Sequence, residues 1–261
     1  MPDDIQSRTE GPIRWLIFNR PDKHNAMSLE MTQAAHAVIE DFASNDAERV
    51  LIVTGSGGKA FISGADISEF DSNRGNADDA ARYSDMTNRM FFSLRDVEKP
   101  TIAMIDGICF GGGVALATCC DLRFCSEASR FSVPAARLGV GYSPDYVKFL
   151  QDIVGPARTK EILFTARRYG AQEAFEMGLV NRVFGDNDLR PEVRAIAETI
   201  AGNAPLTIRA AKLSVAELVK PDGERDMSKP QAAVADCMDS TDFKNARRAF
   251  MAKEKPVFEG R

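Results

Sequence analysis

Residues 101–120 are the stretch that most constrains how this chain can fold. Thr101–Ile105 is short, apolar and partly β-branched, which predicts a buried strand. Residues 111–113 are all glycine, and the run VALATCC that follows them contains no helix breaker. The pattern therefore predicts a buried strand, a glycine turn and a buried helix in close succession.

The glycine turn allows two interpretations. The first N–H groups of a helix have no partner inside it, and the helix dipole makes that end attractive to negative charge. Because glycine has no Cβ to block a ligand, the turn can offer bare N–H groups to an oxyanion. The alternative is that the glycines only let the helix pack closely on the sheet. Val114 and Ala115, which stand where a phosphate-binding P-loop needs Lys and then Ser or Thr, argue against such a loop. Cys109 stands where the dinucleotide-binding fingerprint needs a glycine.

The composition restricts the classes of function. The chain has 261 residues, of which 44% are hydrophobic, enough for one large core. Its net charge of −5 and the lack of a basic run argue against a nucleic-acid partner. No apolar run reaches the roughly 18 residues of a membrane span, and the acidic N-terminal segment is unlike a signal peptide, so we expect a cytoplasmic protein. Five cysteines without CxxC spacing and two histidines outside metal motifs predict reduced thiols and no metal site.

Strands alternate with helices up to about residue 185, which predicts an α/β fold. From about residue 188 the pattern is helical, so we place one boundary between a core of residues 1–187 and a helical region of residues 188–261. Ser28 suits the N-cap of the first helix, and the polar residues 68–78 are expected to be mobile. The expected strands are residues 13–19, 49–54, 61–67, 101–105, 121–125 and 131–133, with one more in the segment that follows Gly178. The expected helices up to that boundary are residues 29–44, 79–97, 114–120, 145–154, 156–165 and 171–178.

Five segments spread along nearly the whole chain carry a family resemblance. They are NRPDKHNAMS, KAFISGADISEF, the long run from IDGICFGGG to VGYSP, FTARRYGAQEAFEMGLVNRV, and FMAKEKPVFEG. Each is a weak signal alone, but in this order they resemble the crotonase superfamily, the enoyl-CoA hydratase/isomerase family. The resemblance implies a spiral of ββα units, with a C-terminal helical region that makes trimers, and two trimers that usually stack into a hexamer.

The resemblance also implies a use for two glycine turns. The backbone N–H groups of Ala65 and Gly112 would point at the thioester carbonyl of a bound acyl-CoA and stabilise an enolate there. Coenzyme A is part of the substrate, so no separate cofactor is expected. The alternative for Lys23 and Lys253 is an ordinary solvated lysine, and the alternative for Phe250 is packing in the core. The implied substrate-binding residues are Lys23, Ala26, Ser63, Gly64, Asp66, Ile67 and Gly111, with Phe250 and Lys253 from a neighbouring subunit.

The sequence departs from the family at two positions. Ala115 and Ala135 stand where hydratases carry the two glutamates that hold a water, and losing a proton-transfer group costs about 10²–10⁴-fold. Tyr142 resembles a tyrosine of the methylmalonyl-CoA decarboxylase branch, although Ala65 replaces the histidine of that branch. Tyr142 and Asp145 are therefore candidate catalytic residues, with a pocket wall and a helix N-cap as the respective alternatives.

Three functions remain open from the sequence. The first is an acyl-CoA enzyme that stabilises a thioester enolate and hydrates crotonyl-CoA slowly. The second is a decarboxylase of malonyl-type thioesters, because departing CO₂ leaves its electrons to the oxyanion site and needs little acid–base help. The third is a non-catalytic acyl-CoA-binding relative that kept the site and lost the chemistry.

Overall fold

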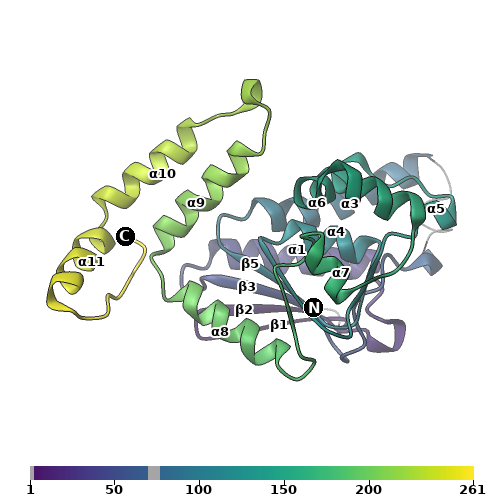
Figure 1. Ribbon diagram of the computed structural model, residues 1–261, viewed down its shortest axis with the longest axis horizontal. Helices are drawn as coiled ribbons and strands as arrows, with labels where there is room; N and C mark the ends of the chain where they lie inside the picture. Colours follow the sequence, from purple (N-terminus) through teal and green to yellow (C-terminus); the bar gives the residue numbers. More distant parts are fainter. Residues whose placement is uncertain (1–2, 70–76) are drawn as a thin grey trace.

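A computed structural model describes residues 3–69 and 77–261, which form a larger and a smaller sheet with helices around them (Figure 1). Apart from the antiparallel outer pairs β1–β2 and β8–β9, neighbouring strands are parallel. The larger sheet has the order β1 (Ile5–Glu10), β2 (Ile13–Phe18), β3 (Val50–Gly55), β5 (Thr101–Ile105), β7 (Leu122–Ser126) and β10 (Arg182–Phe184), and the smaller has β4 (Ala60–Ile62), β6 (Ile108–Phe110), β8 (Arg130–Ser132) and β9 (Tyr169–Gly170).

Alternate residues of the central strands point to opposite faces of the larger sheet, and both faces are buried. On β3, Leu51 and Val53 belong to one hydrophobic cluster, whereas Val50 and Ile52 belong to a second cluster. This is the period of two that a strand imposes on its side chains. Because both faces are covered, the strand is a continuous apolar run, as parallel strands usually are.

Helices cover the two faces of the larger sheet. Helix α1 (Leu29–Ser44) packs beside α3 (Ala77–Asp96) and contributes to the first cluster, while α8 (Leu189–Ala201) contributes to the second. The Ser28 hydroxyl accepts a hydrogen bond from the Met31 N–H at 3.1 Å, which confirms the predicted N-cap. Helix α4 (Gly112–Cys119) is buried along nearly its whole length, and it is the helix expected after the glycine turn.

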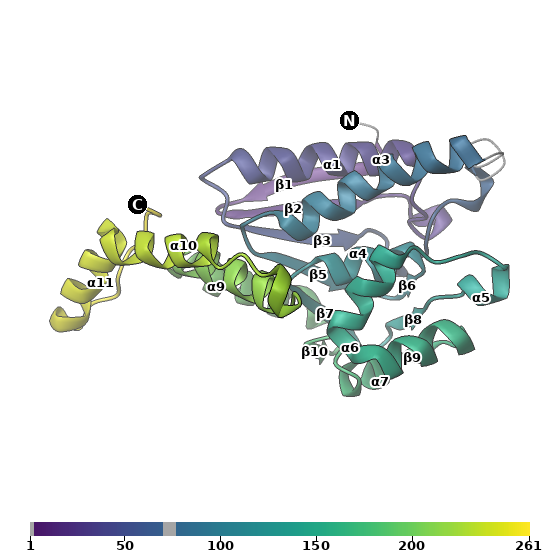
Figure 2. The ribbon, with the colours of Figure 1, turned by 90° about the horizontal axis from the view of Figure 1, so that it is seen from above.

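Three further helices lie near the smaller sheet (Figure 2). They are α5 (Ala135–Leu138), α6 (Pro144–Thr165) and α7 (Ala171–Glu176). Gly155 has a non-helical backbone inside α6, so this helix consists of two segments joined at a kink, as the sequence pattern predicts. Within residues 3–69 and 77–261, every helix is too short or too polar to cross a membrane.

The last three helices project away from both sheets (Figures 1 and 2). They are α9 (Pro205–Leu218), α10 (Ser228–Asp239) and α11 (Thr241–Ala252), and we call residues 205–252 the C-terminal arm. The sequence predicts interruptions of this helical region at Pro205, Pro221 and Pro230. Pro205 begins α9 and Pro221 lies between α9 and α10, but Pro230 lies in the first turn of α10 and does not interrupt it. The division at residue 187 stays a prediction; the projecting part begins one helix later, after α8.

Several short elements differ from the expectation. β1 was not expected because its sequence, IQSRTE, is largely polar, and it forms an edge strand through antiparallel pairing with β2. β6 is only three residues long and lies between two glycine turns, too short for a periodic pattern. The expected strand at residues 61–67 ends at Ile62, and Ile67–Glu69 forms a 3₁₀ turn. Most of the predicted mobile segment lies outside the described residues.

Candidate active site

Two backbone bends lie next to each other beyond the ends of β4 and β6. These strands are parallel neighbours, so both chains leave the same edge of the smaller sheet. A Cβ atom added at Gly112 would lie 3.7 Å from the backbone nitrogen of Ala65, and one added at Gly111 would lie 3.9 Å from the Cα of Gly64. The structure therefore brings residues 64–65 and 111–112 together.

The N–H of Ala65 points away from the protein segment that pairs with this bend. The Met27 N–H donates to the Gly64 carbonyl at 2.8 Å, and the Met27 carbonyl accepts from the Asp66 N–H at 2.8 Å. Ala65 lies between Gly64 and Asp66, which both bond to Met27. In such a parallel bridge the N–H of the middle residue points away from the paired segment, here away from Met27. Among the residues that the structure describes, no hydrogen bond uses the N–H of Ala65.

Gly112 offers a second unused donor beside the first. It is the first residue of α4, so its N–H has no acceptor within the helix. No hydrogen bond within the described part of the chain uses it. The two bends thus place two uncommitted N–H groups close together, one of them at the positive end of the α4 dipole.

The glycines of the turn serve different purposes. Gly111 has φ +51° and ψ −113°, a conformation that side-chain-bearing residues rarely adopt. A Cβ atom at Gly113 would lie only 2.3 Å from the backbone oxygen of Ile62. Gly113 therefore permits the close packing of α4 on β4, so the packing interpretation holds for this glycine, while the neighbouring bare N–H remains available at Gly112.

A polar loop, residues 20–26, packs against the Ala65 bend and carries Lys23 and Ala26. The Ser63 N–H donates to the His24 carbonyl at 3.1 Å, and Asn25 anchors the other side of the loop. The buried Asn25 amide donates to the carbonyls of Ser56 and Ala60 at 3.0 and 2.7 Å. Asn25 was not predicted from the sequence, although it lies within the segment NRPDKHNAMS.

Asp66 fastens this loop to the bend. Its carboxylate accepts hydrogen bonds from the Ser68 hydroxyl at 2.6 Å and from Arg20 at 2.7 Å. The Ser68 hydroxyl, together with the Ser68 N–H and the Arg20 guanidinium, lowers the pKa of Asp66 to about 2, although burial acts in the opposite direction. Lys23 is half exposed, and its Nζ lies 3.8 Å from the Asp66 carboxylate. Ile67, the residue after Asp66, is 61% exposed. Arg20, which also lies in the segment NRPDKHNAMS, was not predicted from the sequence.

Tyr142 lies beside the glycine turn. Its hydroxyl donates a hydrogen bond to the Gly111 carbonyl at 3.1 Å, and burial raises the pKa of its phenol. Asp145 is exposed in the first turn of α6, and the N-cap of that helix is Ser143, so the N-cap alternative for Asp145 is wrong. Ala115 is buried in α4 and Ala135 begins α5, and a methyl group at either position can neither take nor give a proton.

The two candidate residues near the C-terminus are distant from the bends within one chain. Phe250 lies on α11 at the end of the projecting arm, and Lys253 directly follows this helix (Figure 1). Phe250 is 81% exposed, so the core-packing alternative for this residue is wrong. Phe250 and Met251 line a shallow apolar cavity of about 460 Å³ on α11.

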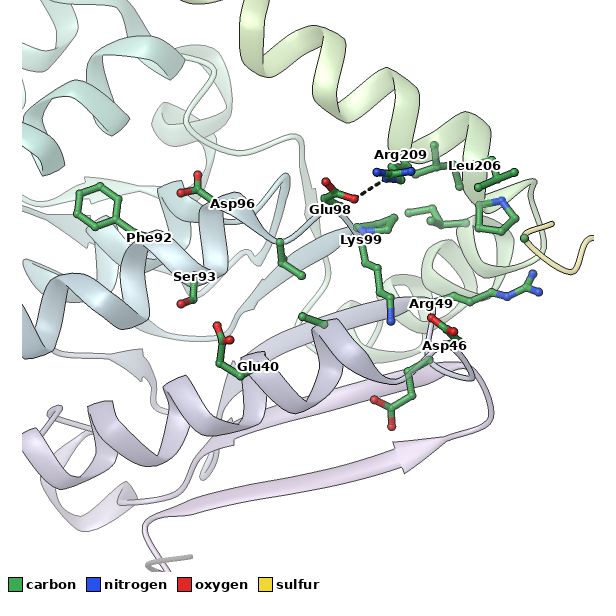
Figure 3. A pocket seen from close by; sticks show the side chains of 18 of the residues that line it. Glu40, Asp46, Arg49, Phe92, Ser93, Asp96, Glu98, Lys99, Leu206 and Arg209 are labelled. Carbon is green, nitrogen blue, oxygen red and sulfur yellow. Dashed lines mark hydrogen bonds and ion pairs between the residues drawn. The ribbon is translucent and has the colours of Figure 1, made fainter. Parts of the chain in front are cut away.

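A larger cavity of about 1270 Å³ lies between α1, α3 and the base of the C-terminal arm (Figure 3). Charges of both signs line it, including Glu40, Asp96 and Lys99, and Arg209 pairs with Glu98 across it. It shares no residue with either bend. Among the described residues, no group of three or more His, Cys, Asp or Glu side chains gathers as a metal site would require.

Comparison with known proteins agrees with this architecture. Residues 8–261 match the family model described as enoyl-CoA hydratase/isomerase. A crotonyl-CoA hydratase of Syntrophomonas wolfei is 36% identical over 98% of both chains, and a peroxisomal Δ(3,5)-Δ(2,4)-dienoyl-CoA isomerase of Arabidopsis thaliana is 33% identical over 97% of this chain and 95% of the relative. The crystal structure of an enoyl-CoA hydratase/carnithine racemase from Magnetospirillum magneticum, 37% identical, superposes with a TM-score of 0.94 over 100% of this chain and 97% of that chain. The chain therefore belongs to the enoyl-CoA hydratase/isomerase family of the crotonase superfamily, and its expected α/β fold is confirmed.

Proposed function

We propose that this protein is an enzyme that acts on acyl-CoA thioesters and stabilises a thioester enolate at the backbone N–H groups of Ala65 and Gly112. The relatives support the substrate class, since they are named as a crotonyl-CoA hydratase and a dienoyl-CoA isomerase. The observation that carries the proposal is the proximity of two unused donors, with Ala65 N 3.7 Å from a Cβ position at Gly112.

Two fixed donors favour negative charge that develops on the oxygen between them. When the α-carbon of a thioester loses a proton or a carboxylate, its electrons move to the carbonyl oxygen. Preorganised N–H groups lower the free energy of this enolate, and losing one donor from a comparable site raises the barrier by about 3–4 kcal/mol. Coenzyme A is part of the substrate, so the proposed reaction uses no separate cofactor.

We assign the surroundings of the two donors to substrate binding. Lys23 is half exposed and can pair with a phosphate at the nucleotide end of coenzyme A, beside Ala26. Ile67 offers an exposed apolar side chain to the pantetheine arm. Phe250 on α11 and Lys253 directly after that helix are both exposed, which suits contact with the coenzyme A of a neighbouring subunit. The remaining proposed binding residues are Ser63, Gly64, Asp66 and Gly111.

Turnover by the wild-type protein and by Gly112→Pro tests the enolate-stabilising role. Proline lacks an N–H and fits the first position of a helix, so this variant removes one donor with little change to α4. We expect turnover of at least one of crotonyl-CoA, malonyl-CoA and methylmalonyl-CoA, measured by mass spectrometry, and a loss of about 10²–10³-fold in Gly112→Pro.

Gly112→Ala is the matched control for this experiment. It keeps the N–H and adds a Cβ whose nearest neighbour, at 2.9 Å, is the flexible end of Met27, so its activity is expected to lie well above that of Gly112→Pro. Equal rates in the wild type and Gly112→Pro would contradict the proposal. Tight binding of the thioesters with no turnover would favour the non-catalytic acyl-CoA-binding alternative.

A malonyl-type acyl-CoA decarboxylase is the second candidate function. Ala115 and Ala135 favour it, because loss of CO₂ requires an oxyanion site but no carboxylate base. For the same reason, hydration of crotonyl-CoA is expected to be at least about 10²-fold slower than in a family member with both glutamates. Formation of acetyl-CoA from malonyl-CoA, or of propionyl-CoA from methylmalonyl-CoA, would favour the decarboxylase. Rapid loss of the enoyl absorbance of crotonyl-CoA would contradict it.

A further inference from the structure

We infer that Tyr142 is a positioning residue whose hydroxyl polarises the peptide bond between Gly111 and Gly112 and so strengthens the Gly112 N–H as a hydrogen-bond donor. The inference rests on the proposed function, because the strength of this donor matters only if it binds a thioester oxygen. It assigns the Tyr142 hydroxyl to the support of the glycine turn and not to proton transfer with the substrate.

The atoms involved belong to one peptide unit. The Tyr142 hydroxyl donates to the Gly111 carbonyl oxygen at 3.1 Å, and the Ala115 N–H donates to the same oxygen at 3.2 Å. The Gly111 carbonyl and the Gly112 N–H are the two ends of a single planar, conjugated amide. Hydrogen bonds in a chain polarise one another, so donors at the carbonyl end increase the positive charge of the N–H at the other end.

Packing holds the Tyr142 ring in the orientation that this bond requires. The ring lies edge-on to Tyr146, with 5.8 Å between the centroids. Tyr146 packs in turn on Phe91 of α3 at 4.8 Å, and its hydroxyl donates to the Asn88 side chain at 2.7 Å. Burial raises the pKa of Tyr142, so its phenol stays protonated and remains a donor at neutral pH.

The expected effect of losing the hydroxyl is small but measurable. A whole oxyanion donor contributes roughly 10²–10³-fold to the rate, and one hydrogen bond strengthens its neighbour by roughly 10–30%. Tyr142→Phe is therefore expected to lower kcat about two- to eightfold. KM is expected to change little, because the ring and its packing remain.

Infrared spectroscopy of bound acetyl-CoA, labelled with ¹³C at the thioester carbonyl, separates polarisation from a general structural effect. In the wild type we expect the carbonyl band to move to lower frequency on binding. In Tyr142→Phe this movement is expected to be smaller at unchanged affinity for acetyl-CoA. Tyr169→Phe is the matched control: it removes a buried hydroxyl that lies 3.3 Å from the Thr165 hydroxyl, and it is expected to keep the wild-type band.

The outcomes distinguish the two proposals. A wild-type band that stays at its solution frequency would overturn the oxyanion site and the role of Tyr142 with it. A wild-type band that moves, but moves equally in Tyr142→Phe, would overturn the role of Tyr142 alone. A reduced movement shared by Tyr142→Phe and Tyr169→Phe would also overturn it, because loss of any buried hydroxyl would then produce the effect.

Discussion

Asp66 connects two segments whose side chains and backbone we assign to substrate binding. In the folded protein its pKa is about 2, held there by Ser68 and Arg20, against an ordinary value of 3.8. Because the folded state binds the proton more weakly than the unfolded state, the ionised carboxylate stabilises the fold above about pH 4. This stabilisation is lost as the pH falls from about 4 to about 2.

Asp66→Asn is expected to lower the free energy of unfolding by about 1–2 kcal/mol at pH 7, and by progressively less between pH 4 and pH 2. Urea unfolding of both proteins at several pH values measures this. Asp22→Asn changes an exposed aspartate of the same loop and is expected to stay within about 0.5 kcal/mol of the wild type. If the free energy of unfolding of Asp66→Asn were lower than that of the wild type by the same amount at every pH, the ion pair would not be the cause.

Among the elements, α4 can lie on β4 only because residue 113 has no side chain. A Cβ atom there would lie 2.3 Å from the Ile62 backbone oxygen. To relieve this clash, the backbone of α4 or β4 would have to shift, and such a shift would displace the Gly112 N–H. Gly113→Ala is therefore expected to lower the free energy of unfolding by about 1–3 kcal/mol, measured by urea denaturation, and to reduce turnover.

Gly141→Ala is the control for that substitution. An added Cβ at Gly141 has no atom within 4 Å, so the free energy of unfolding is expected to change by less than about 0.5 kcal/mol. If the two alanine variants were equally stable, close contact between α4 and β4 would not explain why glycine stands at residue 113.

In the molecule as a whole, the C-terminal arm exposes more apolar surface than is usual for a monomeric protein. Seven large apolar side chains are more than half exposed between residues 215 and 251. They lie on helices that project from the sheets (Figure 2), so they can be buried only by something outside this chain. We propose that other copies of the chain cover them, as a trimer or a pair of trimers. The side chains are Val215, Leu218, Val219, Val234, Met238, Phe250 and Met251.

Sedimentation equilibrium tests this assembly. The wild type is expected to have three or six times the mass of the 28.6 kDa chain, and the double substitution Phe250→Asp and Met251→Asp is expected to shift the distribution towards the single chain. Phe164→Asp is the control, because Phe164 is 74% exposed but lies on α6, outside the arm. A wild type that sediments as a single chain would rule the assembly out.

Several elements and the family of this chain could be predicted from short segments of sequence. The buried strand at residues 101–105, the helix behind the glycines and the N-cap at Ser28 depend on neighbouring residues, so local patterns are enough to predict them. The polar edge strand β1 and the three-residue β6 have no such pattern, because pairing with distant strands stabilises them.

The construction of the site depends on contacts between residues that are far apart in the sequence. The family resemblance implied that Ala65 and Gly112 share one site, but no local pattern contains this proximity, which follows from the parallel pairing of β4 with β6. Nor could it predict that Tyr142 bonds to the Gly111 carbonyl, 31 residues away, or that Arg20 bonds to Asp66 across 46 residues. Local sequence fixes backbone preferences within a few residues, whereas contacts between distant residues form only when the whole core packs.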